Sequence, residues 1–279
     1  MIASILALAL MQVGPNPSLD AFPGTPEELR NRPPREKPAI TMSIPEERQQ
    51  QFANCLTEAR DDPETALDTA NAWRMTADND LDLVRSAHCL GLALVTLERF
   101  DEARQIFEVA SAEAPEDFGK YRARLLAMAG NAAMSDRKPA VAEPLFATAL
   151  ERALAEGDAD LASDLSADRA GALALAERHD DAVDALRMAR EQNPQSIRAW
   201  LMSAMLLRRL ERYGEAQEMI EQAATVNPRN PAVGLEAGII AALSGREEDA
   251  RRSFESVLIV APDSEWANRA TAYLEQLNQ

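Results

Sequence analysis

A spacing of 34 residues recurs in the C-terminal half of the chain and constrains its fold more than any other feature. Proline recurs at Pro194, Pro228 and Pro262. An alanine lies twelve residues before each proline, at Ala182, Ala216 and Ala250. A large apolar residue, such as Ile220 or Phe254, lies between the two, and most other positions vary between copies. A fixed period of this length predicts one small helical unit that is repeated and stacked.

The same pattern extends toward the N-terminus. A fourth copy at residues 98–117 has small, large apolar, small and proline residues at the same offsets, namely Ala103, Phe107, Ala110 and Pro115. A looser fifth copy lacks the proline but keeps Ala142, Phe146 and Ala149. Each copy is preceded by a second helical pattern with one position that is always small, which is Gly91, Gly130, Ala170, Ala204 or Gly238. Each unit is therefore expected to contain two helices, called A and B below.

The repeated unit has small residues at its eighth, twentieth and usually twenty-seventh places, a large apolar residue at its twenty-fourth and a proline at its thirty-second. This pattern resembles the tetratricopeptide repeat family. The resemblance implies an all-α fold, a right-handed α-α superhelix (solenoid) of tetratricopeptide helical hairpins. Helices A and B would approach closely at the eighth and twentieth places, so only Gly or Ala fits there. The large residue would fill the gap against the next repeat, and the proline, which has no N–H, would end helix B.

The resemblance covers residues 47–279 and divides them into six repeats. We expect these repeats at residues 47–80, 84–117, 123–162, 163–196, 197–230 and 231–264. The first is degenerate, and the third is stretched because its B helix runs on to a turn at Gly157 and Asp158. Residues 265–279 carry apolar residues at helical spacing, so we expect a capping helix that covers the last exposed apolar face.

The residues before the repeats form two segments of different composition. Residues 1–13 are uncharged and mostly apolar, which matches a secretory h-region in length but only about half of a bilayer span. No Lys or Arg precedes this leader, and no clear cleavage site follows it. We interpret it as a signal peptide, with a short apolar tail and an uncleaved weak membrane anchor as alternatives. Residues 14–46 are rich in proline and are predicted to be a disordered linker.

Charge and motifs argue against nucleic-acid binding and catalysis. The formal net charge is −17, and an acidic surface of this size repels phosphate backbones. The two histidines, His88 and His179, lie in different repeats without a Cys/His cluster nearby, so we expect no metal site. The sequence contains no glycine-rich phosphate loop and no G-x-S-x-G or H-E-x-x-H motif. We therefore expect no catalytic residues and no cofactor.

The two cysteines of the chain are 34 residues apart, which is one repeat period. Cys55 and Cys89 fall on the expected A helices of adjacent repeats, and such helices pack side by side. In an oxidising compartment a disulfide between them would secure the degenerate first repeat. The alternative is that both cysteines are small buried apolar side chains.

In the family that the repeats resemble, helix A lines the inner groove with its places 2, 5, 9 and 12. On this sequence those places hold four arginines and one aspartate, a balance of +3 in an acidic chain. The third repeat also offers Met134 there, and the fourth offers small residues such as Gly171 and Ala174, which would form a flat floor. The groove residues expected to contact a partner are Arg124, Asn131, Arg198, Leu201, Met205, Arg208, Leu235 and Ile239.

Two interpretations of these groove residues remain open. In the first, Arg198 and Arg208 bind carboxylates of a partner, and Met205 adapts to its apolar part. In the second, the apolar residues pack against neighbouring A helices and the arginines pair with acidic residues of the same chain. The carboxylate clamp of chaperone-binding family members is not expected, because Asn131 and Arg198 match it but Ala127, Asp168 and Met202 do not.

The sequence thus favours a non-catalytic protein–protein interaction scaffold in a bacterial envelope, periplasmic or secreted. Its expected partner is a protein or peptide with acidic and apolar residues. The alternatives are a cytoplasmic adaptor and a self-associating structural protein. The sequence does not define the oligomeric state.

Overall fold

The structure, a computed structural model, describes residues 46–278, which contain thirteen α-helices, one short 3-10 helix and no strand. The expected leader (1–13) and nearly all of the expected linker (14–46) lie outside the described residues. Within residues 46–278, no helix is both long enough and apolar enough to cross a membrane.

The helices form six consecutive hairpins and a terminal helix. The hairpins are α2 (Glu46–Asp61) with α3 (Pro63–Thr76), α4 (Asp80–Thr96) with α5 (Phe100–Glu113), α6 (Gly119–Ser135) with α7 (Pro139–Ala155), α8 (Ala159–Leu175) with α9 (His179–Gln192), α10 (Ile197–Arg209) with α11 (Tyr213–Val226), and α12 (Pro231–Leu243) with α13 (Glu247–Val260). The short helix η2 (Glu116–Phe118) precedes α6, and α14 (Glu265–Leu277) follows the last hairpin.

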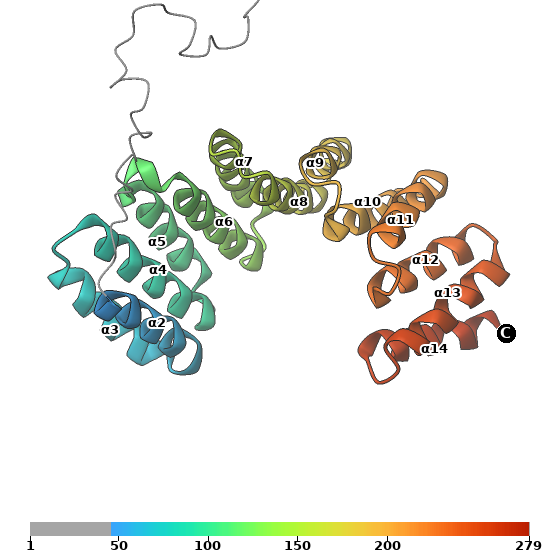
Figure 1. Cartoon of the computed structure of the whole chain (residues 1–279), viewed down its shortest axis with the longest axis horizontal. Helices are drawn as coiled ribbons and strands as arrows, with labels where there is room; N and C mark the ends of the chain where they lie inside the picture. The colour runs from blue at the N-terminus through green and yellow to red at the C-terminus, as the bar shows by residue number, and fades with distance from the viewer. Residues whose placement is uncertain (1–45, 279) are drawn as a thin grey trace, which may run out of the picture. The chain divides into compact units, whose positions relative to one another are not determined.

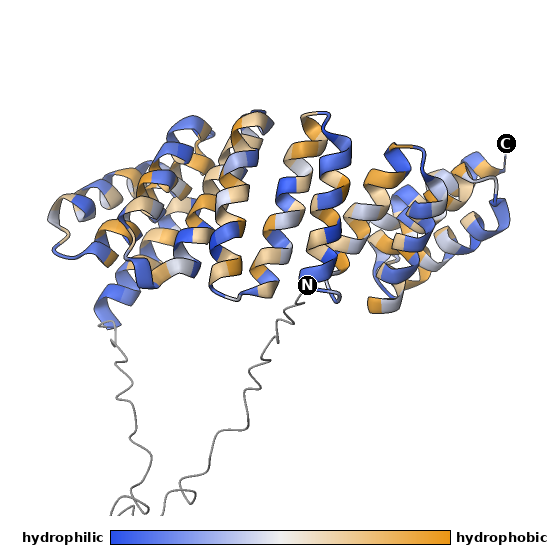
Figure 2. Cartoon of the chain, turned by 90° about the horizontal axis from the view of Figure 1, so that it is seen from above, coloured by the Kyte–Doolittle hydropathy of each residue, from blue (hydrophilic) through white to orange (hydrophobic). Residues whose placement is uncertain are grey.

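Each hairpin packs mainly on its neighbours in the chain, so the described part is a solenoid of tetratricopeptide-type hairpins (Figure 1). Helix α14 packs against α12 and α13, where Ala270, Tyr273 and Leu274 join the last apolar cluster. This is the capping role expected for residues 265–279. Apolar and polar residues are interspersed along most of the helices (Figure 2), because each of these helices contacts neighbours on part of its surface and solvent on the rest.

In the second to sixth repeats, the eighth and twenty-fourth places are matched in size. A Cβ atom added to Gly91 would lie 2.5 Å from Cε1 of Phe107, and one added to Gly130 would lie 2.6 Å from Cε1 of Phe146. Where the twenty-fourth place holds the smaller Leu186 or Ile220, the eighth place holds alanine instead. The large residue therefore lies over the small residue of its own repeat, and not only against the next repeat as the sequence suggested.

The turn between helices A and B has one conformation in five repeats. Its middle residue has a positive φ of 57° to 73° and is Glu98, Arg137, Glu177, Glu211 or Gly245. In four of these turns the next residue is an arginine whose guanidinium pairs with a carboxylate three residues later, as Arg212 does with Glu215. This ion pair spans the first turn of helix B, where no side chain accepts a hydrogen bond from the backbone N–H groups.

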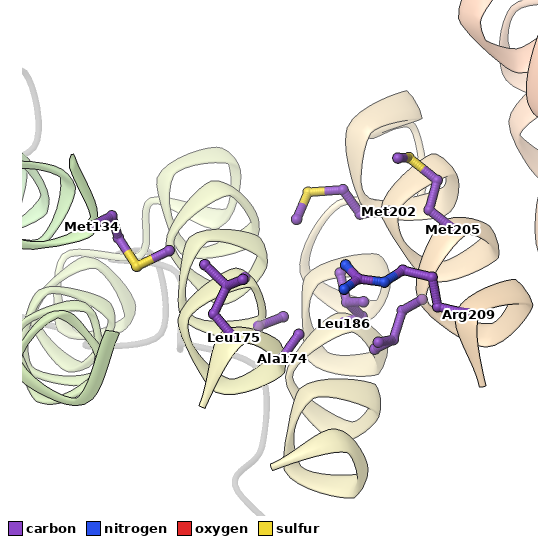
Figure 3. Close-up of a pocket in the computed structure, with 10 residues that line it drawn as sticks. Met134, Ala174, Leu175, Leu186, Met202, Met205 and Arg209 are labelled. Atoms are coloured by element: carbon purple, nitrogen blue, oxygen red, sulfur yellow. The ribbon is translucent and has the colours of Figure 1, made fainter. Parts of the chain in front are cut away.

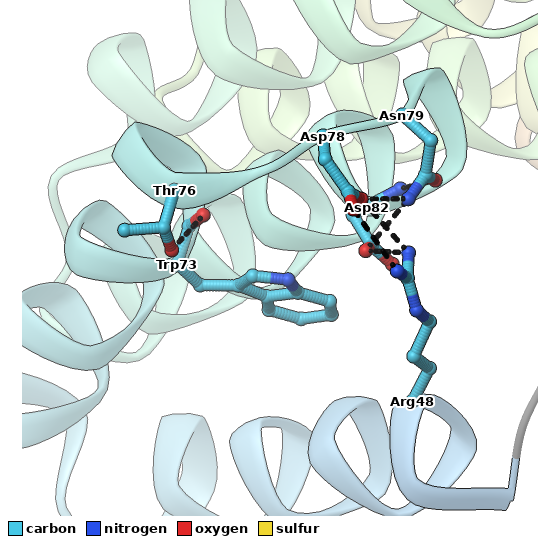
Figure 4. A network of polar contacts seen from close by, with 6 residues as sticks. All are labelled: Arg48, Trp73, Thr76, Asp78, Asn79 and Asp82. Atoms are coloured by element: carbon cyan, nitrogen blue, oxygen red, sulfur yellow. Dashed lines mark hydrogen bonds and ion pairs between the residues drawn. The ribbon is translucent and has the colours of Figure 1, made fainter.

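The first hairpin is attached to the second through α2 and α4. The Sγ atoms of Cys55 and Cys89 form a disulfide bond, with their Cα atoms 6.0 Å apart. At the N-terminal ends of the two helices, the Arg48 guanidinium donates to Asp78 at 3.1 Å and also to Asp82 (Figure 4). Asn79 caps α4 by accepting a hydrogen bond from the backbone N–H of Asp82 at 2.9 Å. A covalent bond and an ion-pair network thus hold the degenerate first repeat.

Three A helices begin one turn earlier than the 34-residue register indicates. Helices α4, α6 and α8 begin at residues 80, 119 and 159, instead of 84, 123 and 163. The expected third repeat (123–162) therefore differs at both ends, because residues 119–122 belong to α6 and residues 159–162 belong to α8. The three helices contain 17 residues each, whereas α10 and α12 contain 13.

Candidate functional site

An open apolar pocket of about 270 Å³ lies between α6, α8 and α10 (Figure 3). We call it the methionine pocket, and its lining is Met134, Ala170, Gly171, Ala174, Leu175, Leu186, Met202, Met205, Leu206 and Arg209. Met134, Gly171, Ala174 and Met205 occupy places that the family resemblance assigns to the inner groove. The pocket therefore lies on the face where the sequence predicted a groove.

The floor of the methionine pocket is open because its central residues are small. No heavy atom lies within 4 Å of a Cβ added to Gly171, so nothing in the fold requires glycine at this position. A glycine inside a helix costs roughly 0.5–1 kcal/mol relative to alanine. Unlike Gly91 and Gly130, Gly171 therefore leaves space that no residue of the described chain occupies.

The rim of the pocket exposes large apolar side chains to solvent. Leu175 is 59% exposed and Met205 is 40% exposed. Exposed apolar groups gathered around a concavity are typical of a binding surface. Methionine side chains are flexible and polarisable, so they fit apolar groups of different shapes.

The two arginines predicted to meet a partner's charge are already paired within the chain. Arg198 pairs with Asp168 and donates to the backbone carbonyl of Asp164 at 3.1 Å. Arg208 pairs with Glu236, which is only 5% exposed. The structure thus favours the second interpretation for these two arginines, namely pairing with acidic residues of the same chain.

The other predicted groove residues divide into exposed and packed ones. Arg124 and Asn131 are exposed on α6. Leu201 is half-buried against the cluster of α10–α12, and Ile239 is half-buried against the cluster of α12–α14. Leu235 is 2% exposed and belongs to that last cluster, so its prediction as a partner-contacting residue is corrected.

Six lining residues of the methionine pocket were not anticipated as groove residues, namely Ala170, Leu175, Leu186, Met202, Leu206 and Arg209. Leu175 and Arg209 end helices α8 and α10, and Leu186 reaches the pocket from helix α9. Met202 lies three residues before Met205 and hence on the same face of α10. The spacing of the two methionines was the one signal in the sequence that could have identified Met202.

Buried polar groups near these helices have shifted pKa values. Burial raises the pKa of Asp168, although Arg198 hydrogen-bonds to its carboxylate and opposes the shift. At the other end of the chain, burial lowers the pKa of His88 to about 4. Its Nδ1 atom lies 2.8 Å from the Tyr121 hydroxyl, and burial raises the pKa of that hydroxyl. His88 is therefore a neutral core residue at pH 7.

No group of three or more His, Cys, Asp or Glu side chains within residues 46–278 is placed to hold a metal ion. The carboxylates of the A-helix face, such as Asp168 and Glu236, are engaged by arginines. The arrangement at the methionine pocket is suited to holding an apolar side chain.

Comparison with known proteins gives one family and a set of similar folds. A family model described as "Tetratricopeptide repeat" matches residues 127–197 and 201–265. The fold resembles the crystal structure of PilW, described as a widely conserved type IV pilus biogenesis factor. The sequence identity is 16%, the match covers 83% of this chain and 100% of that chain, and the TM-score is 0.61. It also resembles yeast Tom70, with 18% identity, 83% and 47% covered, and a TM-score of 0.60. At such identities the likeness shows the fold alone, and no curated protein matches the sequence significantly.

Proposed function

Because the chain is a tetratricopeptide repeat protein, we propose that it is a non-catalytic scaffold that binds a segment of a partner protein on its A-helix face. An apolar side chain of the partner enters the methionine pocket. The observation that carries this proposal is the unfilled floor at Gly171 beneath the exposed Met205 and Leu175. Burying such apolar surface contributes about 25 cal/mol per Å².

The occupant is a partner segment with at least one large apolar side chain. The lining contains one charged residue, Arg209, which has no ion pair or hydrogen bond to any residue between 46 and 278. A carboxylate beside the apolar side chain would pair with this guanidinium. A segment with both acidic and apolar residues therefore fits the pocket.

Site-specific photocrosslinking in the native host tests this proposal. Met205→p-benzoylphenylalanine places a photoreactive group on the rim, and Ile259→p-benzoylphenylalanine places one on the outer helix α13, where Ile259 is 80% exposed. A crosslinked partner is expected at position 205 and not at position 259. The additional substitution Gly171→Leu fills the pocket and is expected to remove the crosslink.

The matched control is Gly214→Leu. Gly214 also has no heavy atom within 4 Å of an added Cβ, but it lies in the first turn of the outer helix α11. The crosslink at position 205 should survive this change. A crosslink that persists in the Gly171→Leu protein would contradict the proposal, and crosslinking of the chain only to itself would favour self-association instead.

We also propose that the protein works outside the cytoplasm, in a bacterial envelope. The disulfide between Cys55 and Cys89 supports this, since structural disulfides persist in oxidising compartments and are rare in the cytosol. The apolar composition of residues 1–13 agrees with export. Cell fractionation tests the proposal, and recovery of the protein solely in the cytoplasmic fraction with reduced cysteines would contradict it.

A further inference from the structure

A second pocket, of about 560 Å³, lies at the other end of helix α6. We call it the arginine pocket, and its lining is Phe52, Leu81, Arg85, Asp117, Phe118, Lys120, Tyr121, Arg124 and Glu156. It combines three cationic side chains with three aromatic rings in a chain whose net charge is −17. An excess of positive charge at one place on an acidic protein indicates an anionic partner.

Arg85 carries the main evidence. Its guanidinium lies over the ring of Phe52, with Cζ 5.3 Å from the ring centroid. Its Nη1 atom is shielded from solvent and has no hydrogen-bond partner within residues 46–278. A buried N–H group without a partner costs roughly 1–3 kcal/mol. An acceptor that contacts this N–H group would remove that cost.

The other charged groups of the arginine pocket divide into engaged and free ones. Lys120 pairs with Asp158 at 3.1 Å. The carboxylate of Glu156 lies over Gly119, at the positive end of the α6 dipole. Arg124 is exposed and makes no ion pair or hydrogen bond within the described chain, although its charge also helps to lower the pKa of the Asp158 carboxyl. Two arginines, Arg85 and Arg124, are therefore available to one anion, with Asp117 as the remaining acidic group of the lining.

We propose that the arginine pocket binds an Asp or Glu side chain of the same partner segment whose apolar side chain enters the methionine pocket. The inference thus deepens the proposed function and rests on it for the identity of the partner. A single carboxylate accepts charge-assisted hydrogen bonds from Arg85 and Arg124. A polyanion is disfavoured because the acidic surface repels it. The rings of Phe52, Phe118 and Tyr121 pack against the methylene groups of the bound side chain.

The geometry of α6 sets a minimum spacing between the acidic and the apolar residue of the partner. Arg124 of the arginine pocket and Met134 of the methionine pocket are ten residues apart on this helix. At 1.5 Å per residue they lie about 15 Å apart along its axis, and at 3.6 residues per turn about 80° apart around it. An extended segment covers that axial distance with about five residues.

Titration of the full chain with short peptides tests the arginine pocket by itself. The first probe is acetyl-Gly-Glu-Glu-Gly-amide, which has no large apolar side chain, and its partner probe replaces both glutamates with glutamine. Binding of the acidic probe is expected to weaken at least tenfold in the Arg85→Gln/Arg124→Gln protein. The glutamine probe is expected not to bind. Arg229→Gln is the matched charge control, because the side chain of Arg229 is exposed and makes no ion pair in the turn after α11.

Further probes separate the alternatives. Inorganic phosphate is expected to bind more weakly than the acidic peptide, and equal binding with equal loss in the double variant would overturn the assignment to a carboxylate side chain. Unchanged binding of the acidic peptide in the double variant would overturn the site altogether. Because that probe cannot use the methionine pocket, Gly171→Leu is expected to leave its binding intact whether or not the proposed function holds.

The spacing is tested with peptides that carry one Glu and one Leu separated by two or by eight glycine and serine residues. The protein carries Arg209→Gln, so that a Glu close to the Leu has no partner at the methionine pocket. The longer peptide is expected to bind at least fivefold more tightly than the shorter one, because only the longer one reaches both pockets. Gly171→Leu in the same protein is expected to abolish this difference. Equal affinity of the two peptides for the Arg209→Gln protein would show that the two pockets do not share a segment.

Discussion

Gly130 lies directly under the ring of Phe146, so close that a methyl group at this glycine would be 2.6 Å from Cε1 of the ring. Phe146 is fully buried, and the ring therefore has no room to withdraw toward solvent. The pairs Gly91–Phe107 and Gly238–Phe254 have the same arrangement. In the pairs Ala170–Leu186 and Ala204–Ile220, the smaller apolar residue is matched by alanine. The combined size of the two residues is thus preserved from repeat to repeat.

The methyl group added by Gly130→Ala overpacks the site, which costs roughly 1–3 kcal/mol. Helix propensity offsets about 1 kcal/mol of this cost, so we expect a net destabilisation of up to about 2 kcal/mol. The double variant Gly130→Ala/Phe146→Leu copies the Ala170–Leu186 pair and should be more stable than the sum of its two single variants predicts. Urea unfolding of all four proteins measures the coupling, and strictly additive changes would contradict the matched-size explanation.

Replacement of both cysteines by serine is expected to destabilise α2 and α3 selectively. The disulfide bond joins residues 34 apart in sequence. By lowering the entropy of the unfolded chain, a cross-link over that length adds about 3–4 kcal/mol to the free energy of unfolding. Since each repeat contacts only its neighbours, the loss should stay local. Hydrogen exchange should speed up in α2 and α3 and remain unchanged in α12 to α14. Two free thiols in native material, measured by non-reducing mass spectrometry, would contradict the bond itself.

Arg208→Ala and Arg198→Ala are expected to differ in their cost, although both remove an intrachain ion pair. Removal of the Arg208 guanidinium leaves the side chain of Glu236, which is 7% exposed, as an uncompensated buried charge. We therefore expect the free energy of unfolding to fall by about 3 kcal/mol. Arg198→Ala leaves behind the carboxylate of Asp168, which is 20% exposed and so better hydrated than that of Glu236, and we expect a smaller loss of about 1 kcal/mol. Chemical denaturation measures both. Equally small losses of unfolding free energy in the two variants would show that the Arg208–Glu236 pair does not stabilise the fold.

The free energy of unfolding is expected to fall as the pH drops from about 6.5 to about 4, because His88 takes up a proton in the unfolded chain before it does so in the folded chain. Burial lowers the pKa of His88 to about 4 in the folded chain, against an ordinary value of 6.5. Between these values the unfolded chain binds the proton and the folded chain does not, so acidification favours unfolding. The full effect is about 3 kcal/mol, developed as the pH falls from about 6.5 to about 4.

The matched variant for this pH effect is His88→Gln, which has no titrating group at this position. The difference in unfolding free energy between pH 7 and pH 4.5 should be larger in the unmodified protein by about 2 kcal/mol. Parallel pH profiles of the two proteins would contradict a neutral buried imidazole.

The hairpin architecture was predictable because it rests on steric requirements that repeat in the sequence. Small residues such as Ala103, Ala216 and Ala250 are fully buried in the structure, as close helix contact requires. The early starts of α4 and α8 were missed because the register was counted in steps of 34. The capping residues Asn79 and Asp158 were available signals, since each accepts a hydrogen bond from the backbone of the first turn.

The site was less predictable, because pairing between helices is not visible in local sequence. Asp168 and Glu236 lie 30 and 28 residues from the arginines that they engage, and Glu236 is outside the places assigned to the groove. Arg124 is exposed and its contact with a partner stays a prediction, and the structure was needed to bring Arg85 and Phe52 to the same pocket. Which arginines remain free is a property of the folded chain.

The covalent link between α2 and α4 has a mechanical consequence. Tension applied to the chain from its N-terminal side enters the folded part at α2. A stack of hairpins without such a link would be unzipped from that end, one hairpin after another. Here the load passes from Cys55 to Cys89 and bypasses the 33 residues between them, so beyond Cys55 the chain is pulled through the middle of α4 and helix α3 carries no load.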